Sequence, residues 1–213
     1  MGSRTTTVGL TLHLFPSDPK TNLLPYDGIV NDFGLILSPS EADTFFEVIL
    51  ANTAWQSDEA MIFGKHIITK RKVAWYGDKE YIYHYSGTRK HSLPWTNPIL
   101  ALKEIVEKKM ALTFNSCLLN LYHSGEEGMA WHADDEKSLG ENTIIASLSL
   151  GAERKFSFRH KKTRETISLV LAHGSLLVMK GETQTYWQHC LPKSARVKKP
   201  RINLTFRRFL EGS

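Results

Sequence analysis

The chain has 213 residues, which is enough for one domain with a sizeable core and too few for two domains of ordinary size. Hydrophobic residues make up 41% and charged residues 23% of it, as in an ordinary globular protein, and this excludes an intrinsically disordered chain. No apolar run reaches the roughly 18 residues of a membrane-spanning helix. The two cysteines, with no secretory leader before them, predict a reducing compartment rather than a disulfide framework.

In chain order, residues 1–33 are predicted to form an irregular N-terminal arm, because prolines and a glycine interrupt them. Ser38 to Glu41 has the pattern of a capping box with proline at the first helical position, followed by apolar residues at helical spacing. A second helix is predicted to begin at Asn97. Between the helices, β-forming residues and glycine turns indicate a hairpin-rich region.

From Phe114 onward, short runs of β-forming residues are separated by glycine, charged or proline-containing turns. The candidate strands are 116–122, 144–150, 154–159, 166–171, 175–179, 185–190 and 201–209. Many short strands behind two helices predict an α+β, mainly β fold, a double-stranded β-helix (jelly roll), rather than an alternating α/β sheet. Residues 34–213 are therefore expected to form a single domain, with its jelly-roll core at 114–210.

Basic residues are unevenly distributed along the chain. They gather at 65–72, at 159–164 and at 193–208, where there are seven Lys or Arg and no Asp or Glu. Such clusters favour a polyanionic partner, because each basic side chain can neutralise a phosphate and release counterions. A solvated basic face would give the same pattern.

A possible metal site begins at His132 and Asp134, which lie two residues apart, and continues at His189 in a later β-rich stretch. On an extended segment, this spacing directs both side chains to the same side. Two imidazoles and one carboxylate on one side of a metal leave open positions, as at non-haem Fe(II). Zinc accepts the same ligands with a water molecule, so the triad alone does not choose the metal.

The segment from Arg201 to Arg207 alternates strictly between polar and apolar side chains. Two arginines that face a barrel interior need anionic partners, because an unpaired buried charge is costly. A dicarboxylate bound to the metal would supply them, although an exposed basic face is the alternative. The side chains that could line this cavity are Arg201, Asn203, Thr205 and Arg207, together with Asn120 and Tyr122 from an earlier strand.

These residues resemble the AlkB family of Fe(II)/2-oxoglutarate dioxygenases. The matching pieces are 120–122, 132–136, 146–151 with 156–160, His189 and 201–207, and the resemblance covers most of residues 60–210. It implies that His132, Asp134 and His189 hold Fe(II), with 2-oxoglutarate and O2 as co-substrates. Arg201 and Tyr122 would bind the distal carboxylate of 2-oxoglutarate, and Asn120, Asn203, Thr205 and Arg207 would line the rest of its site.

The resemblance also implies an activity. It is the oxidative demethylation of N-alkylated bases such as 1-methyladenine and 3-methylcytosine in DNA, with release of formaldehyde, succinate and CO2. A methylated base inside a duplex has to be flipped out to reach the metal. The likeness is strongest to the branch of the family that acts on duplex DNA, in which residues 60–90 would form a nucleotide-recognition lid on the catalytic domain.

Residues expected to contact the substrate follow from that branch. Phe63 would be an aromatic finger that fills the gap left by the flipped base, and Arg71 would contact the DNA backbone. Tyr85 and His132 would sandwich the base. The full set is Phe63, Gly64, Lys65, Arg71, Tyr83, His84, Tyr85, Asp135 and Glu136. The branch has phenylalanine at the position of Tyr85 and a small polar residue at that of His84, and its loop after His189 is spaced differently.

Two other functions are compatible with parts of the sequence. The chain could be an RNA or single-strand demethylase of the same family. It could also be a nucleic-acid-binding module without activity, although the intact triad and the intact strand at 201–207 argue against this. The expected protein is a monomer that meets no membrane. It would be nuclear in a eukaryote and located in the cytoplasm or nucleoid of a bacterium.

Overall fold

The computed structural model describes residues 18–62, 65–85 and 88–210, and for 60–62, 65–67, 82–85 and 88–90 the backbone alone. Its larger sheet contains, in spatial order, β1 (Ile29–Leu35), β12 (Ser175–Lys180), β9 (Ile145–Gly151), β14 (Arg201–Arg207), β7 (Ser116–Tyr122), β3 (Lys65–Gly77) and β2 (Gln56–Ile62), with β6 (Leu93–Pro94) beside β3. The smaller sheet contains β11 (Thr166–Leu171), β10 (Arg154–His160), β13 (Trp187–Leu191) and β8 (Met129–His132). A separate hairpin pairs β4 (Ile82–Tyr85) with β5 (Thr88–His91).

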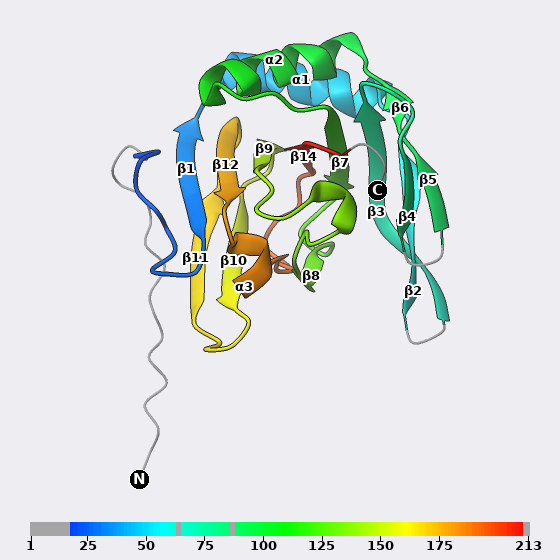
Figure 1. The fold of residues 1–213 in the computed structure, drawn as a ribbon. Helices are drawn as coiled ribbons and strands as arrows, with labels where there is room; N and C mark the ends of the chain where they lie inside the picture. The colour runs from blue at the N-terminus through cyan, green and yellow to red at the C-terminus, as the bar shows by residue number, and fades with distance from the viewer. Residues whose placement is uncertain (1–17, 63–64, 86–87, 211–213) are drawn as a thin grey trace.

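The two long helices begin where the sequence predicts. In α1 (Pro39–Asn52), the Ser38 side chain accepts the N–H of Glu41, and the Glu41 carboxylate accepts the N–H of Ser38. This capping box satisfies donors that would otherwise be unpaired at the helix start. The second helix, α2 (Asn97–Met110), has proline in its first turn and ends at Ala111 in a left-handed conformation. The two helices lie side by side at the top of Figure 1.

The larger sheet has two chemically different faces because side chains alternate along each strand. One face packs against both helices, and its central residues, such as Leu119, Leu148 and Leu204, have no exposed surface. The opposite face carries the polar residues of β14 and β7 into a cavity whose other wall is the smaller sheet. The predicted jelly roll is confirmed, and its architecture leaves a cavity between two sheets that both polar and apolar side chains line.

Two local departures from the prediction concern the ends of strands. The irregular arm expected through residue 33 ends earlier, because β1 begins at Ile29 and pairs with β12 after a turn at Asp27 and Gly28. Asn and Asp inside β1 are weak strand formers, so the sequence pattern did not reveal it. The strand expected at 185–190 begins only at Trp187, and a one-turn helix, α3 (Thr183–Tyr186), precedes it.

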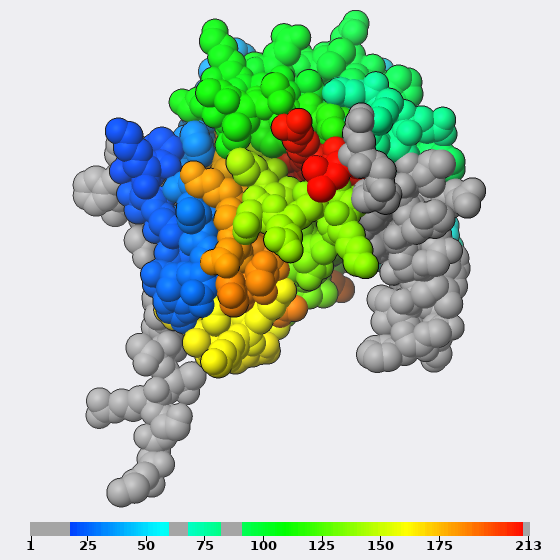
Figure 2. Space-filling view, in the orientation of Figure 1, coloured from blue at the N-terminus to red at the C-terminus, as the bar shows by residue number. Residues whose placement is uncertain are grey.

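The C-terminal segment adds Phe209 to the lining of the cavity between the two sheets. Leu210 donates its N–H to the carbonyl of Ser138, in the short 3-10 helix Lys137–Leu139 that follows β8. Asn115 holds Phe209 by bonds to both its N–H and its carbonyl. In Figure 2, the red atoms of this segment lie against the yellow-green atoms of the loop after β8. No helix in the described ranges is long and apolar enough to cross a membrane.

Candidate metal and anion site

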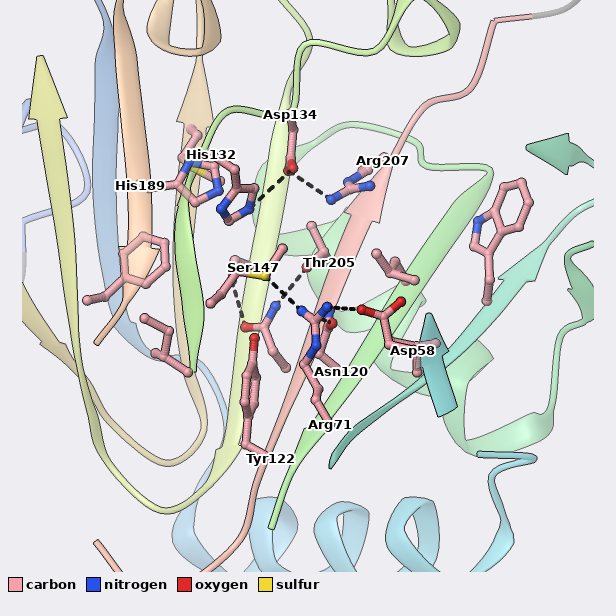
Figure 3. Close-up of a pocket in the computed structure, with 18 of the residues that line it drawn as sticks. Asp58, Arg71, Asn120, Tyr122, His132, Asp134, Ser147, His189, Thr205 and Arg207 are labelled. Carbon is pink, nitrogen blue, oxygen red and sulfur yellow. Dashed lines mark hydrogen bonds and ion pairs between the residues drawn. The ribbon is translucent and has the colours of Figure 1, made fainter. Parts of the chain in front are cut away.

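The predicted metal ligands converge at one end of the cavity. His132 ends β8 and faces His189 of β13 across the smaller sheet, and Asp134 follows two residues later. One ligand atom from each of the three residues lies within 4.8 Å of the others, and Figure 3 shows the side chains pointing toward one another. His189 and Asp134 are buried, whereas the His132 side chain is 30% exposed. The triad thus lies at the cavity mouth with one imidazole accessible.

The two imidazoles are prepared for a metal. The Nδ1–H of His132 donates to the Ala130 carbonyl over 2.9 Å, because a carbonyl can only accept, and this orients the ring so that Nε2 is the nitrogen directed toward Asp134. Burial, and to a lesser degree the neighbouring His132, lowers the pKa of His189 to about 3, so this imidazole is neutral at physiological pH. Neutral nitrogen donors and one carboxylate fit Fe(II), the metal that the AlkB resemblance implies.

The carboxylate of Asp134 is kept ionised by its surroundings. Burial alone would raise its pKa, but the opposing effects, of which the charge of Arg207 is the largest, hold the pKa below its usual value. Arg207 Nη2 donates to Asp134 Oδ2 over 2.8 Å, as the dashed line in Figure 3 shows. Arg207 therefore stabilises the charge of a metal ligand, in addition to lining the cavity as expected.

At the other end of β14, Arg201 is almost completely buried and makes only neutral contacts. Its Nη2 donates to Ser149 Oγ over 2.9 Å and to Asn203 Oδ1 over 2.8 Å. No carboxylate in the described part of the chain pairs with Arg201, and its Nε has no hydrogen-bond partner there. Burial lowers its pKa to about 10. A buried cation without an anion is costly, so this arginine fits an anionic ligand.

The other residues expected at the co-substrate site surround Arg201. Cross-strand register places Tyr122 opposite Arg201 and Asn120 opposite Asn203. The guanidinium carbon of Arg201 lies 5.7 Å from the centroid of the Tyr122 ring. Asn203 in turn donates to Thr205 Oγ1 over 2.7 Å. All of them line the same cavity as the metal triad, with a volume of about 170 Å³, roughly ten times what one water molecule requires. A small dicarboxylate therefore has room beside the metal.

Arg71, expected to contact the DNA, lines the same cavity as the metal triad. Its side chain is 11% exposed and points into the cavity, where it forms an ion pair with Asp58 and donates to Asn120 Oδ1 over 3.1 Å. The reason is strand alternation, which puts Arg71 on the same face of β3 as Val73 and Trp75, two other cavity residues. The contact of Arg71 with DNA, which the resemblance implies, stays a prediction.

The expected substrate residues are only partly described. Glu136 lines the cavity, whereas Asp135 is exposed and lies 3.8 Å from Lys161. Alternation along an extended segment explains why neighbouring acids point in opposite directions. Phe63 and Gly64 lie outside the described residues, and so do the side chains of Lys65, Tyr83, His84 and Tyr85.

Four polar residues of the site were missed by the sequence analysis. Ser147 donates to Asn203 Oδ1 over 2.9 Å, and Ser149 accepts from Arg201. Their spacing on β9, between buried apolar residues, repeats the alternation of β14 and could have revealed them. Asp58 and Gln184 carry no such signal, because a β-bulge and a one-turn helix place them.

The basic cluster at 193–208 combines two kinds of residue. Arg201 and Arg207 belong to the cavity, while the other five basic side chains are exposed: Lys193, Arg196, Lys198, Lys199 and Arg208. A half-buried cation lies on the outer face of the smaller sheet, where the guanidinium of Arg159 stacks 4.2 Å from the Trp131 ring centroid. A basic and aromatic surface thus adjoins the metal triad.

Comparisons with known proteins agree with this geometry. The family model described as the 2OG-Fe(II) oxygenase superfamily matches residues 32–207. The chain is 36% identical over 195 residues to "DNA oxidative demethylase ALKBH2" of Bos taurus, covering 86% of this chain and 70% of the relative. It is 40% identical over 177 residues to "Alpha-ketoglutarate-dependent dioxygenase alkB homolog 3" of Homo sapiens, covering 78% of this chain and 61% of the relative.

A solved structure supports the fold. "The structure of OsALKBH1" superposes with a TM-score of 0.60 and 14% identity, covering 87% of this chain and 98% of the other. At this identity the likeness concerns the fold alone, and it agrees with the two-sheet arrangement described above.

Proposed function

The chain belongs to the AlkB family within the 2OG-Fe(II) oxygenase superfamily, and on that premise we propose that it is a DNA oxidative demethylase. The reaction would remove alkyl groups from 1-methyladenine and 3-methylcytosine, consume O2 and 2-oxoglutarate, and release formaldehyde, succinate and CO2. The alternative within the same family is a demethylase of RNA or of single strands.

One observation supports oxygenase chemistry in this cavity. A metal-binding triad and a buried, carboxylate-free Arg201 line the same cavity. A simple zinc hydrolase has no need for a second anion site of this kind, whereas 2-oxoglutarate needs one for its distal carboxylate. The pairing of the two sites therefore favours the oxygenase over the zinc alternative that the triad alone left open.

The residues around the metal triad and Arg201 have proposed roles. His132, Asp134 and His189 would hold Fe(II), which when bound supplies the coupling of 2-oxoglutarate decarboxylation to oxidation of the alkyl group. Arg201, with Tyr122 beside it, would bind the distal carboxylate by charge-assisted hydrogen bonds. Asn203, Thr205 and Ser147 orient one another and would fix the co-substrate. Arg207 keeps Asp134 ionised.

DNA as the substrate is supported by the relatives, whose names include DNA oxidative demethylase. The exposed cations of 193–208 and the Arg159–Trp131 pair beside the triad are compatible with a polyanionic ligand. His132 is exposed enough to form one wall of a base pocket, with Glu136 at its edge. For the lid, Phe63, Gly64, Lys65, Tyr83, His84 and Tyr85 remain proposed contacts by resemblance.

The test is mass spectrometry of oligonucleotides that each carry one lesion, incubated with the protein, Fe(II), 2-oxoglutarate and O2. We expect 1-methyladenine to be converted to adenine and 3-methylcytosine to cytosine, with one succinate released per repaired base. Asp134→Ala and His132→Ala should abolish repair. Full repair by either variant, or by protein stripped of metal, would refute the proposed mechanism.

Single-stranded DNA, duplex DNA and RNA carrying the same lesion separate the two candidate substrates. If the lid acts as proposed, Phe63→Ala loses activity on the duplex and keeps most of it on the single strand. An equal loss of activity on duplex and on single-stranded DNA would contradict a finger role for Phe63. Faster repair of RNA than of either DNA would favour the alternative function.

A further inference from the structure

Gln184 is a buried residue to which the description of the site above gives no role. It lies in the one-turn helix α3, fifty residues after Asp134 in the sequence, and its side chain is directed at the backbone of Asp134. Its Oε1 accepts the backbone N–H of Asp134 over 2.9 Å. Its Nε2 lies 3.6 Å from Met179 Sδ, another cavity residue.

The backbone of Asp134 needs such a partner. β8 ends at His132, so the N–H of Asp134 has no strand partner to donate to. A buried N–H without an acceptor costs roughly 1–3 kcal/mol. Gln184 supplies the acceptor, and it does so at the residue that carries the metal-binding carboxylate.

The helix that carries Gln184 is itself anchored on two sides. Thr183 Oγ1 accepts the N–H of Ile29 over 2.9 Å and lies 2.6 Å from the carbonyl of Lys180. On the other side, Lys161 Nζ donates to the Gln184 carbonyl over 2.9 Å. Gly28 packs so closely that a Cβ added there would lie 2.9 Å from Thr183 Oγ1. These contacts leave α3 little freedom to move away from Asp134.

We propose that Gln184 is a positioning residue for the metal site, an inference that rests on the proposed function. Asp134 is held at two points: Gln184 fixes its backbone, and Arg207 fixes its carboxylate. With the backbone released, the carboxylate can turn away from the two imidazoles. Partners that orient metal ligands are typically worth roughly 10- to 100-fold in metal affinity.

The test is a titration of the metal-free protein with Mn(II), followed by the shift in melting temperature, which reports the dissociation constant without any turnover. Gln184→Met keeps the side-chain length and removes the acceptor, so we expect binding weaker by roughly 10- to 100-fold. Gln184→Glu keeps an acceptor oxygen and should restore most of the affinity.

Glu107→Met is the matched control. Glu107 Oε1 accepts the N–H of Phe114 over 2.7 Å from α2, on the helix-covered face of the larger sheet. This variant loses the same kind of backbone acceptor, together with an ion pair to Lys103, and should melt lower without any change in Mn(II) affinity. Native affinity in Gln184→Met, with a lower melting temperature alone, would overturn the inference. Failure of the native protein to bind Mn(II) would instead refute the metal site, and the inference with it.

Discussion

The two ends of β14 carry the same side chain in two electrostatic situations. At one end, Arg207 lies 2.8 Å from the carboxylate of Asp134. At the other end, Arg201 is buried more deeply and contacts only Ser149 and Asn203 among hydrogen-bond acceptors. The charge of Arg207 is thus already balanced by the protein, while that of Arg201 is balanced by nothing in the described cavity. A ligand carboxylate is therefore expected at Arg201.

This difference assigns the two arginines to separate tasks although they lie only six residues apart on one strand. Arg207 serves the metal, because it lowers the pKa of a metal ligand. Arg201 serves the co-substrate, because burial without an anion makes it a strong site for one. Variants at the two ends should therefore affect two different binding constants.

The largest expected effect follows from Arg201→Met. Losing one partner of a buried charge pair is worth about 2–5 kcal/mol, so 2-oxoglutarate should bind roughly 30-fold to several thousandfold more weakly. Calorimetric titration of the Mn(II)-loaded protein measures this directly. Mn(II) affinity should be native, and the exposed Lys199→Met should change neither constant. A variant that still binds 2-oxoglutarate normally would show that Arg201 has no ligand.

Arg207→Met should produce the complementary result. Without this cation the pKa of Asp134 rises, and Mn(II) affinity should fall roughly 10- to 100-fold. The neighbouring Arg208 is exposed, so Arg208→Met is the control for loss of charge alone. Binding of 2-oxoglutarate by the metal-loaded variant should change less than in Arg201→Met. If Arg207→Met lost more 2-oxoglutarate affinity than Arg201→Met, the assignment of Arg207 to the metal and Arg201 to the co-substrate would be contradicted.

The metal end should also be recognisable by its pH dependence. The pKa of His189 is about 3 in the folded chain and 6.5 for an ordinary imidazole, so between these values the unfolded state binds more protons. Stability of the metal-free protein should therefore fall as pH drops below 6.5, by at most about 1.4 kcal/mol per pH unit from this residue. Urea denaturation from pH 7.5 to 4.5 measures the slope.

His189→Gln is the comparison for that slope. It removes the imidazole, so its stability should depend less on pH than that of the native chain over the same range. Asp134, whose folded pKa is lowered, contributes stability above its ordinary pKa and loses it only in stronger acid. Identical slopes in the two proteins would contradict a neutral buried His189.

The smallest expected effect is that of Ser149→Ala. The hydroxyl orients Arg201 through one hydrogen bond, worth about 0.5–1.5 kcal/mol, so 2-oxoglutarate should bind roughly 2- to 12-fold more weakly. In an Arg201→Met background the same change should have no further effect. An equal loss in both backgrounds would mean that Ser149 acts independently of Arg201.

The parts of the site that could be predicted from the sequence are those in which side chains alternate regularly within one short segment. Strict alternation from Arg201 to Arg207 placed four side chains on one face, and the structure has them on the cavity side of β14. His132 and Asp134 followed from the same reasoning. The capping box at Ser38 likewise depends only on neighbouring residues.

The parts that could not be predicted depend on contacts between distant segments. Asp58 reaches Arg71 because the register of β2 and β3 shifts between Ser57 and Glu59, and no local pattern marks that bulge. Gln184 belongs to a single helical turn that overlaps the start of the strand predicted at 185–190. Its hydrogen-bond partner, Asp134, is fifty residues away in the sequence. The ion pair of Arg71 with Asp58 likewise joins two strands and has no local signal, whereas the DNA contact that the resemblance implies for Arg71 stays a prediction.

The most direct test compares a dicarboxylate with a monocarboxylate. The Mn(II)-loaded native protein is titrated with 2-oxoglutarate and with 2-oxobutyrate, which keeps the 2-oxo acid group that would face the metal and lacks the distal carboxylate. We predict that 2-oxoglutarate binds at least roughly 30-fold more tightly, because only its distal carboxylate can pair with Arg201. Equal affinity for the two acids would contradict an anion site at Arg201.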